Sequence, residues 1–588
     1  MTDPVAVLAE RLAPAFAAAR DGSCAGAGLD PAEVPAPPVV RRSDRADFQA
    51  DGALALAKRL GRNPREVAAE VEAAADLDGL VTEVEIAGPG FLNLTLADGA
   101  LTDWLTAAHV DDRLDVAPDP GAGTVVVDYS APNVAKEMHV GHLRSTVIGD
   151  ALVRVLAHLG HDVVRENHVG DWGAPFGMLI EHLLDVGEST AVAELSVGDL
   201  NRFYQEARRS FDGSDEFKER ARERVVLLQS GDEETLRLWR VLVEQSAVYF
   251  QAVYDRLGVL LTPDDIVGES AYNDALPGVV ADLDAAGLLV VDDGAECVFP
   301  PGFTGRDGEP QPMIVRNRNG GYGYAATDLA TIRDRVDRTG AERILYVVGA
   351  PQRDHLEMVF AVSRMAGWLP EGITAEHVPF GNLLGSDGKM FKTRSGASVR
   401  LVDLLDEAVA RAEEAVGERN PDLVGEERAA VARAVGIGAI KYADLSSDRV
   451  KDYVLDFDRM LAFEGNTGPY MQYAHARIRS IFRRGEVDPS SLDASLLALG
   501  EPQERALALA LVGFGAVVAQ TAASSQPHRL CGYLFDLAQT FTSFYEACPV
   551  LKADSEATRA SRLVLCDLTA RTLATGLGLL GIESPDRM

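Results

Sequence analysis

The spacing of apolar residues changes character twice within residues 124–170. Thr124–Val127 is a β-branched apolar run of strand length, and a second such run begins at Asp162. Between them, apolar residues recur at helical spacing as far as Gly160, where a helix is expected to end. The pattern predicts a strand, a helix and a parallel strand joined by a right-handed crossover.

Residues 1–118 are predicted to form a small separate domain. Apolar residues at helical spacing indicate one helix over Val5–Phe16 and another over Phe48–Leu60. Apolar residues within Val81–Leu96 indicate strands. A stretch rich in proline and glycine, residues 117–123, reads as a linker to the next part of the chain.

Residues 124 to about 400 are predicted to form an α/β core. Within it, residues 185–262 are charged, have helical spacing and lack a strand pattern. They are therefore expected to be a helical insertion between the two halves of a parallel sheet. Strands are expected to return at Ile314–Val315 and at Ile344–Gly349.

From Leu401 onward the pattern is almost entirely helical, and residues 437–588 are expected to form a helix bundle. The longest apolar run, Ala506–Ala519, is too short to span a bilayer and predicts a buried helix. The N-terminus lacks the basic start and continuous apolar core of a secretory signal. No membrane association is expected.

The composition is that of a globular enzyme, with 47% hydrophobic and 25% charged residues. The net charge of −34, taken alone, argues against a nucleic-acid partner, because phosphate contacts need Lys and Arg. Arginines nevertheless crowd residues 202–224 and 477–484, for which a solvated helix face is the alternative. The five cysteines form no CxxC pair, which argues against a zinc site and favours a reduced, cytoplasmic protein.

The sequence His139-Val140-Gly141-His142 falls where the first strand joins its helix. A helix start favours phosphate, Gly141 lets a ligand approach the backbone closely, and two imidazoles can donate hydrogen bonds to phosphoryl oxygens. This joint suits transfer at an α-phosphate, where charge builds on oxygen. Four residues of this type also occur by chance or in structural turns; the strand, helix and Pro-Asn loop around them favour the functional interpretation.

Cations lie near this joint and in a later loop. The glycine-rich loop 386–396 contains Lys389, Lys392 and Arg394, and mobile cations near a nucleotide can follow the charge that moves onto pyrophosphate. Lys136 precedes the histidine pair and can supply a further cation to the same phosphates. For both, the alternative is an exposed loop with solvated lysines.

Two further groups suit recognition. Tyr324 and Asp328 share one face if their segment is helical, and carboxylates beside an aromatic ring can bind a cationic side chain. Tyr470, Tyr473 and Arg477 mix aromatic rings with a cation, which suits stacking on unpaired bases. The alternatives are exposed acids in the first group, and buried tyrosines with solvated arginines in the second.

At these residues the sequence resembles the arginyl-tRNA synthetases, a branch of the class I aminoacyl-tRNA synthetases. The similarity extends over nearly the whole chain and is least evident before about residue 85. The stretches that carry it are 127–146, 167–173, 268–270, 324–328, 465–477 and 580–588.

The resemblance implies a Rossmann-like catalytic domain with a parallel sheet and a helical insertion, between a small N-terminal α+β domain and a C-terminal all-α bundle. The implied reaction joins L-arginine to tRNA(Arg) through an arginyl-adenylate made from ATP, with transfer to the 2′-hydroxyl of the terminal adenosine. Mg²⁺ is expected to accompany ATP, and no metal ligand is expected in the protein. The enzyme is expected to be a cytoplasmic monomer. It is also expected to need tRNA even for the first step. The implied domains are 1–118 (additional, tRNA-binding), 119–400 (catalytic, with the insertion 185–262), 401–465 (connecting) and 466–588 (anticodon-binding).

The same resemblance implies the site residues. Asp328, with Tyr324 beside it, is expected to bind the guanidinium, while Asn133 and Glu269 lie near the α-amino group. A lysine substrate would be rejected because it lacks the planar fork of donors. The arginine set is Asn133, Glu269, Tyr324, Asp328 and Gln352. The ATP set is His139, Gly141, His142, Lys389, Met390, Phe391 and Lys392. The catalytic set is Lys136, His139, His142, Lys392 and Arg394. The tRNA set is Phe91, Asn93, Tyr470, Tyr473 and Arg477.

The second signature of the class, normally Lys-Met-Ser-Lys-Ser, is here Met390-Phe391-Lys392-Thr393-Arg394 and lacks its second lysine. Lys136 is the expected substitute, which leaves open which cation contacts pyrophosphate. A non-catalytic paralogue that binds tRNA or arginine is one alternative, but such proteins tend to lose signature residues. A different nucleotidyl transferase with the same joint is another, and it has no evident use for the long helical C-terminal part.

Overall fold

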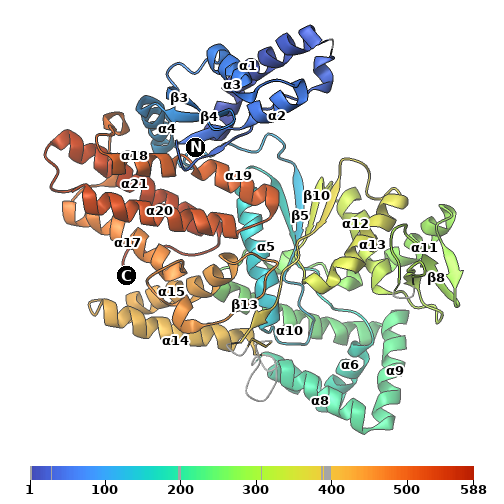
Figure 1. The fold of residues 1–588 in the computed structure, drawn as a ribbon. Helices are drawn as coiled ribbons and strands as arrows, with labels where there is room; N and C mark the ends of the chain where they lie inside the picture. Colours follow the sequence, from blue (N-terminus) through green and yellow to red (C-terminus); the bar gives the residue numbers. More distant parts are fainter. Residues whose placement is uncertain (1–2, 28, 197–199, 306–307, 386–387, 390–398) are drawn as a thin grey trace.

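The computed structural model describes residues 3–588 except 28, 197–199, 306–307, 386–387 and 390–398. An N-terminal α+β unit, an α/β core with a helical insertion, and a helical C-terminal part follow one another along the chain (Figure 1). The predicted fold class, an α/β protein with a parallel-sheet core between these two flanking parts, is confirmed.

The N-terminal unit is a four-stranded antiparallel sheet in the order β1-β2-β4-β3 with helices packed against it. The helix predicted from Phe48 starts later, because Phe48 lies in β2 and pairs with Leu94. The chain turns into the helix at Gly52, where a Cβ atom would lie 2.2 Å from the Pro37 carbonyl oxygen. The elements are α1 (Pro4–Ala27), β1 (Val40–Arg42), β2 (Phe48–Ala50), α2 (Gly52–Leu60), α3 (Pro64–Ala74), β3 (Val81–Ala87), β4 (Phe91–Leu96) and α4 (Asp98–Val110).

The core sheet is wholly parallel and has the order β11-β10-β5-β6. Helix α5 (Val140–His158) connects β5 (Thr124–Asp128) to β6 (Asp162–Glu166). Helix α13 (Arg353–Met365) connects β10 (Arg343–Tyr346) to β11 (Thr374–His377). The two crossovers leave the central strands β5 and β10 in opposite directions. Ligands of open α/β sheets bind at the carboxyl ends of such a pair of strands.

The strand expected at Ile314–Val315 exists but does not belong to the parallel sheet. Strand β9 (Met313–Arg316) completes a separate antiparallel sheet with β7 (Val290–Asp292) and β8 (Ala295–Val298). The described residues between these strands contain no helix, and a parallel pairing would need a crossover of a dozen or more residues. Helices α11 (Leu276–Ala285) and α12 (Tyr324–Asp337) flank this small sheet in the sequence.

The described residues of the insertion form helices joined by short turns, and the chain returns to the core along one long helix, α10. The α10 residue Tyr254 is hydrogen-bonded through its hydroxyl to Ser130 Oγ at 2.8 Å, and it accepts from Asn167 Nδ2 at 3.0 Å. The insertion therefore touches the carboxyl ends of β5 and β6 directly. Its helices are α6 (Pro175–Val186), α7 (Glu188–Ser196), α8 (Leu200–Gly213), α9 (Asp215–Ser230) and α10 (Glu233–Leu257).

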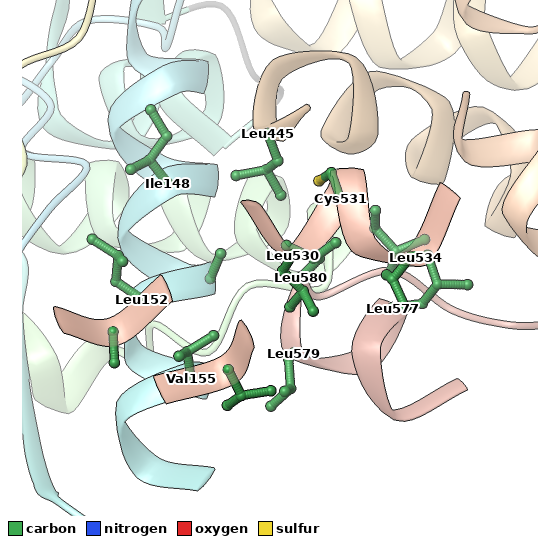
Figure 2. Close-up of a cluster of buried hydrophobic side chains, with 14 of the residues drawn as sticks. Ile148, Leu152, Val155, Leu445, Leu530, Cys531, Leu534, Leu577, Leu579 and Leu580 are labelled. Atoms are coloured by element: carbon green, nitrogen blue, oxygen red, sulfur yellow. The ribbon is translucent and has the colours of Figure 1, made fainter. Parts of the chain in front are cut away.

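The C-terminal part packs on helix α5 through apolar side chains. Figure 2 shows Ile148, Leu152 and Val155 of α5 beside leucines of α20 and α21, all of them buried. The helices are α14 (Leu401–Arg419), α15 (Gly425–Leu445), α16 (Phe457–Met460), α17 (Gly468–Gly485), α18 (Pro502–Leu511), α19 (Phe514–Ser524), α20 (His528–Ala547) and α21 (Glu556–Leu579). Short elements are β12 (Leu383–Leu384), β13 (Tyr453–Val454) and the 3₁₀ turns Pro31–Glu33, Pro263–Asp265, Glu269–Ala275, Ala350–Gln352, Pro489–Ser491 and Ala494–Leu496.

The apolar run predicted to be one buried helix forms two, α18 and α19, which break at Gly513. A Cβ atom there would lie 2.9 Å from the Arg42 guanidinium, which reaches in from β1 and donates to the Leu509 carbonyl. Over the described residues, Pro502–Ser524 is the one helical segment long and apolar enough to cross a membrane. Half of this segment is buried inside the protein, and the core helices of soluble proteins can have the same length and apolar composition.

The N-terminal unit contacts the C-terminal helices, so segments far apart in sequence lie side by side (Figure 1). Arg505 of α18 forms an ion pair with the buried Asp47 at 2.8 Å. Arg571 of α21 donates to the carbonyl oxygens of His109 and Asp111, each at 2.6 Å. The first and last parts of the chain are thus joined by buried or half-buried hydrogen bonds.

Candidate active site

The loop between β5 and α5 has an unusual backbone. Ser130, Ala131 and Ala135 have positive φ angles of 73°, 47° and 58°, a left-handed conformation that costs non-glycine residues of order 1–3 kcal/mol each. Hydrogen bonds hold the loop in this form. The Ala131 N–H donates to Asn167 Oδ1 at 3.0 Å, and the Ala135 N–H donates to Ser246 Oγ of α10 at 2.9 Å. The surrounding fold therefore holds the loop in this form.

The histidine pair begins helix α5. His139 is the N-cap residue, and its Nδ1 accepts from the Gly141 N–H at 3.0 Å. His142 Nδ1 in turn accepts from the His139 N–H at 3.1 Å, and the two ring centroids lie 4.1 Å apart. Because each Nδ1 accepts a hydrogen bond, each neutral ring carries its proton on Nε2. Both rings therefore offer an Nε2–H donor at a helix start.

Burial lowers the pKa of His142 to about 3, with the nearby His139 ring and Lys136 ammonium adding to the effect. The pKa of His139 is also lowered, first by burial and then by Lys136. Both imidazoles are therefore neutral at physiological pH. Neutral donors hold phosphoryl oxygens by hydrogen bonds and are available without any change of protonation.

A pocket of about 360 Å³ lies beside the carboxyl ends of β5 and β10. Asp328 stands one helical turn after Tyr324 in the first turns of α12, so both side chains reach the same pocket. The volume is within the range of small-molecule sites. Its lining residues are Asp128, Ala131, His168, Tyr324, Asp328, Tyr346, Val348, Gln352, His355 and Leu356.

Asp328 has a partner that the sequence pattern did not indicate. His355 Nε2 lies 2.6 Å from Asp328 Oδ2. The neighbouring carboxylate raises the pKa of His355, through this hydrogen bond first and through its charge as well. The two residues are 27 positions apart on different helices, α12 and α13, so no local spacing connects them.

Glu269 lies in the adjoining pocket, which Tyr324 also lines. Burial raises the pKa of Glu269 to about 7, and the negative charges of Asp171 and Asp328 add to the rise, while His168 opposes it. Asp171 fixes the turn, because it accepts from the Ser270 N–H at 2.9 Å and the Ser270 hydroxyl at 2.6 Å. A carboxylate that ionises near neutral pH beside this pocket suits a cationic ligand.

Asn133 is exposed on the same loop as the strained residues. Its backbone forms a parallel bridge with Gly170, where a Cβ atom would lie 2.5 Å from Asn133 Oδ1. Only glycine therefore leaves room for the Asn133 side chain at this point. Gln352 is exposed at the start of α13 and borders the pocket that contains Asp328.

A buried arginine lies under the floor of the pocket. Arg335 of α12 is fully buried and bonds Asp128 Oδ2 at 2.7 Å and Glu166 Oε2 at 2.5 Å. These two carboxylates end the paired strands β5 and β6. Arg335 also lies over the Tyr346 ring at the end of β10, 4.9 Å from the ring centre. It therefore joins the helix that carries Tyr324 and Asp328 to three strand ends, and the sequence pattern gave no sign of it.

The cations of the site fall into three cases. Lys136 is half-buried, with its ammonium 4.6 Å from the centre of the Tyr204 ring of α8. Lys389 is exposed, and its carbonyl accepts from the Gly385 N–H. The remaining predicted residues of the second signature, Met390, Phe391, Lys392 and Arg394, lie outside the described residues.

The residues predicted to bind tRNA lie on two surfaces. Tyr470, Tyr473 and Arg477 are half-buried on α17, with the Arg477 guanidinium 4.7 Å from the Tyr545 ring centre. Phe91 is half-buried on β4. Asn93 is only 3% exposed and accepts from Gln49 Nε2 at 2.6 Å, so its side chain is already engaged inside the sheet.

A parallel sheet with a histidine pair at its first crossover helix, and a carboxylate pocket at the switch point, is the arrangement of a class I aminoacyl-tRNA synthetase catalytic domain. Family models match three successive parts of the chain. Residues 7–96 match the arginyl tRNA synthetase N terminal domain, residues 105–457 the catalytic domain of tRNA synthetases class I (R), and residues 471–588 the DALR anticodon binding domain.

Whole-chain comparisons agree with these models. The chain is 56% identical to the arginine–tRNA ligase of Thermobifida fusca over 588 residues, 100% of both chains, and 50% identical to that of Escherichia coli K12 over 94% of this chain and 96% of that one. Arginyl-tRNA synthetase structures from Plasmodium falciparum (TM-score 0.82, 28% identity, covering 97% and 98%) and Thermus thermophilus (0.79, 28%, 98% and 100%) are similar throughout. The chain belongs to the arginyl-tRNA synthetases, and its activity is the aminoacylation of tRNA(Arg).

Proposed function

We propose that this enzyme first activates L-arginine with ATP to form arginyl-adenylate and pyrophosphate, and then transfers arginine to the 2′-hydroxyl of the terminal adenosine of tRNA(Arg). The observation that carries the proposal is the convergence of two unlike sites at one switch point. Neutral histidine donors at the start of α5 suit phosphate, and the carboxylate pocket beside β10 suits a cationic side chain.

In the first step, the arginine carboxylate attacks the α-phosphorus of ATP, and pyrophosphate leaves. The Nε2–H groups of His139 and His142 donate to phosphoryl oxygens as charge builds there, and Gly141 leaves space for the nucleotide. Among the described side chains, Lys136 is the cation whose charge lowers the pKa of both His139 and His142. Its position supports a role at the leaving pyrophosphate, for which Lys389, Lys392 and Arg394 are the other candidates. Lys389, Met390, Phe391 and Lys392 also bind ATP in this proposal.

The arginine substrate is oriented with its guanidinium at Asp328 and Tyr324 and its α-ammonium group at Glu269 and Asn133. A carboxylate can accept two parallel hydrogen bonds from a planar guanidinium, and lysine cannot make this pair. Gln352 borders the same pocket and completes the set. The ionisation of Glu269 near pH 7 supports its pairing with the α-ammonium group.

The remaining parts of the proposal concern partners and organisation. Mg²⁺ enters with ATP as its counterion; over the described residues, no three His, Cys, Asp or Glu side chains are grouped to hold a metal ion. Phe91, Tyr470, Tyr473 and Arg477 contact tRNA, whereas Asn93, whose side chain is buried against Gln49, supports the Phe91 strand from within the sheet. The enzyme acts as a cytoplasmic monomer. The functional units are 1–118 (tRNA-binding), 119–400 (catalytic, with the insertion 185–262), 401–465 (connecting) and 466–588 (anticodon-binding).

The test is arginine-dependent exchange of pyrophosphate into ATP, with and without unfractionated tRNA, and with lysine as the control amino acid. We expect exchange with arginine only, and only when tRNA is present. His142→Ala and Asp328→Ala should each abolish exchange while the circular dichroism spectrum is unchanged, because they remove a phosphate donor and the guanidinium partner.

Matched controls lie on the same helices. His158→Ala at the other end of α5, and Asp337→Ala at the end of α12, should retain activity near that of the parent enzyme. Exchange with lysine, or near-normal turnover in either site variant, contradicts the site assignment. The absence of exchange from folded protein under every condition would instead favour a paralogue that binds tRNA or arginine without catalysis.

A further inference from the structure

His355 stands at the start of α13, where the chain leaves β10 and enters the pocket proposed to hold arginine. Its side chain is 36% exposed and that of Asp328 is 21% exposed, so the pair lies at the wall of the pocket and is not sealed in the core. The 2.6 Å contact joins His355 Nε2 to one carboxylate oxygen, Oδ2. In the part of the chain that the structure describes, no other hydrogen bond reaches the Asp328 carboxylate, so Oδ1 remains available to a ligand.

We propose that His355 is a positioning residue for the reaction: it fixes the plane of the Asp328 carboxylate for a guanidinium and, when protonated, competes with that guanidinium. The inference rests on the proposed role of Asp328. A fixed plane matters because bidentate binding requires the carboxylate and the guanidinium to be nearly coplanar. The carboxylate of an aspartate rotates freely about its terminal bond unless a neighbour holds one oxygen.

The second half of the proposal follows from charge. A protonated imidazolium already neutralises Asp328, so a guanidinium that arrives there meets a like charge across the carboxylate. The other titratable groups that line the pocket are Asp128, His168, Tyr324 and Tyr346. Asp128 forms a buried ion pair with Arg335. Arg353 and Asp354 precede His355 on α13, yet among the described residues Asp328 is the charge that raises the pKa of His355.

The direction in which the affinity for arginine changes with pH follows from the pKa of His355. Asp328 raises the pKa of His355, so its proton is retained further up the pH scale than in a free histidine. Arginine binding at Asp328 favours loss of that proton to solvent. The apparent affinity for arginine rises as pH rises through the titration of His355, while neutral His355 still donates its Nε2–H and keeps the carboxylate oriented.

The experiment compares three variants in tRNA-supported pyrophosphate exchange, with KM for arginine, KM for ATP and kcat measured separately. His355→Leu removes the donor. His355→Gln keeps an amide donor near the position of Nε2 but has no titrating group. Glu357→Gln, at an exposed position on the same helix, is the matched control for a change of charge. Thermal unfolding of each variant reports on the fold.

We expect His355→Leu to raise KM for arginine about tenfold or more, the equivalent of losing one charge-assisted hydrogen bond, with KM for ATP and kcat within about twofold. His355→Gln should stay within about threefold of the parent at pH 8.5. Between pH 6 and pH 8.5, its KM for arginine should fall less than that of the parent. Glu357→Gln should match the parent throughout.

An unchanged KM for arginine in His355→Leu overturns the positioning role. If His355→Leu instead lowers kcat and the unfolding temperature and raises both KM values, and His355→Gln does not restore them, the role of His355 is structural and the positioning role is overturned. An identical pH profile of KM for arginine in the parent and in His355→Gln overturns the proposed competition between protonated His355 and the substrate guanidinium. These outcomes differ from failure of the proposed function, in which the parent enzyme itself shows no arginine-dependent exchange.

Discussion

Glu269 is the carboxylate of the site whose charge depends most directly on pH. Burial and its acidic neighbours raise its pKa to about 7, so the carboxyl changes its protonation state near neutral pH. In the proposed binding mode, the α-ammonium group of arginine lies beside Glu269 and favours its ionised form. Binding is therefore disfavoured below pH 7, where Glu269 must first lose its proton, and is fully developed above pH 8.

The parent enzyme is accordingly expected to show a KM for arginine that falls by up to about tenfold between pH 6 and pH 8, in the same direction as the effect of His355. Glu269→Gln keeps the shape of the side chain but has no charge, so its KM should be higher at pH 8 and less dependent on pH. The measurement is the pH profile of KM in pyrophosphate exchange.

The double variant Glu269→Gln/His355→Gln serves as the control, and its profile should be nearly flat over the same range. Asp337→Gln, distant in sequence from both residues and exposed, should reproduce the parent profile. A Glu269→Gln enzyme with the full slope of the parent would contradict this account of the pH dependence.

At single positions, the sequence predicted the residues that short-range spacing connects. Tyr324 and Asp328 were expected on one helix face, and α12 places both at one pocket. His355 was not foreseen, because its contact with Asp328 depends on how two helices cross. Arg335 was not foreseen either, since the sequence of an amphipathic helix does not show that one of its arginines will pair with two buried carboxylates.

Helix α12 depends on one buried side chain, that of Arg335. Arg335 satisfies Asp128 and Glu166 inside the core, where an uncompensated charge is costly. Arg335→Leu should therefore destabilise the protein by roughly 3–5 kcal/mol, as expected when one partner of a buried ion pair is removed. Urea unfolding followed by circular dichroism measures the loss.

Arg333 on the same helix supplies the control. It pairs with Asp282 at 2.6 Å, but both side chains are well exposed, 39% and 49%. Arg333→Leu should change the free energy of unfolding by no more than about 1 kcal/mol. Equal effects of the two substitutions would show that burial is not what makes Arg335 important.

Sequence periodicity identified most elements but not all of their partners. The strand, helix and strand over residues 124–166 were predicted, because apolar spacing reports directly on a buried β-α-β unit. Strand β9 was predicted as a strand, yet its antiparallel sheet was not, since pairing depends on the length and path of the connections. The break at Gly513 was missed because Arg42, whose side chain lies beside Gly513 and bonds the Leu509 carbonyl, is on an element far away in sequence.

At the scale of the whole molecule, two proposed tRNA-binding surfaces are held at a fixed separation. The N-terminal unit, which carries Phe91, is joined to the C-terminal helices through Arg505 and Asp47. The C-terminal helices carry Tyr470 and Arg477 on α17. A ligand that binds both surfaces gains affinity only while they stay in register, as in other bivalent interactions.

Arg505→Leu should therefore weaken tRNA binding several-fold while KM for arginine is unchanged. The substitution leaves Asp47 without its charged partner and loosens the contact between the units, but it is remote in the fold from the arginine pocket. Filter binding at fixed ionic strength measures the affinity for tRNA, and pyrophosphate exchange measures KM.

Arg529→Leu is the control, because Arg529 is exposed on α20 and, among the described residues, its side chain donates to Gln526 one turn earlier. Its affinity for tRNA should equal that of the parent. If Arg505→Leu also binds tRNA normally, the contact between the two units has no part in holding the ligand.

The net charge of −34 was read from the sequence as an argument against a nucleic-acid partner, and the tRNA-dependent activity overrules it. A total charge averages over the surface, whereas a phosphate backbone meets only one face. The arginines of α17 illustrate the difference, since Arg477, Arg479, Arg483 and Arg484 lie within two helical turns of one another.

The left-handed loop at Ser130, Ala131 and Ala135 restricts how this enzyme's sequence can vary. Glycine and asparagine adopt positive φ at little cost, whereas valine, isoleucine and threonine at the two alanine positions would clash with their own backbone. In a library with every residue at positions 131 and 135, surviving clones should be enriched in Gly, Asn and Ala and depleted of β-branched residues. The tolerance of position 135 is thus set by backbone angle, and that of position 131, which also lines the pocket of Asp328, by backbone angle and side-chain size.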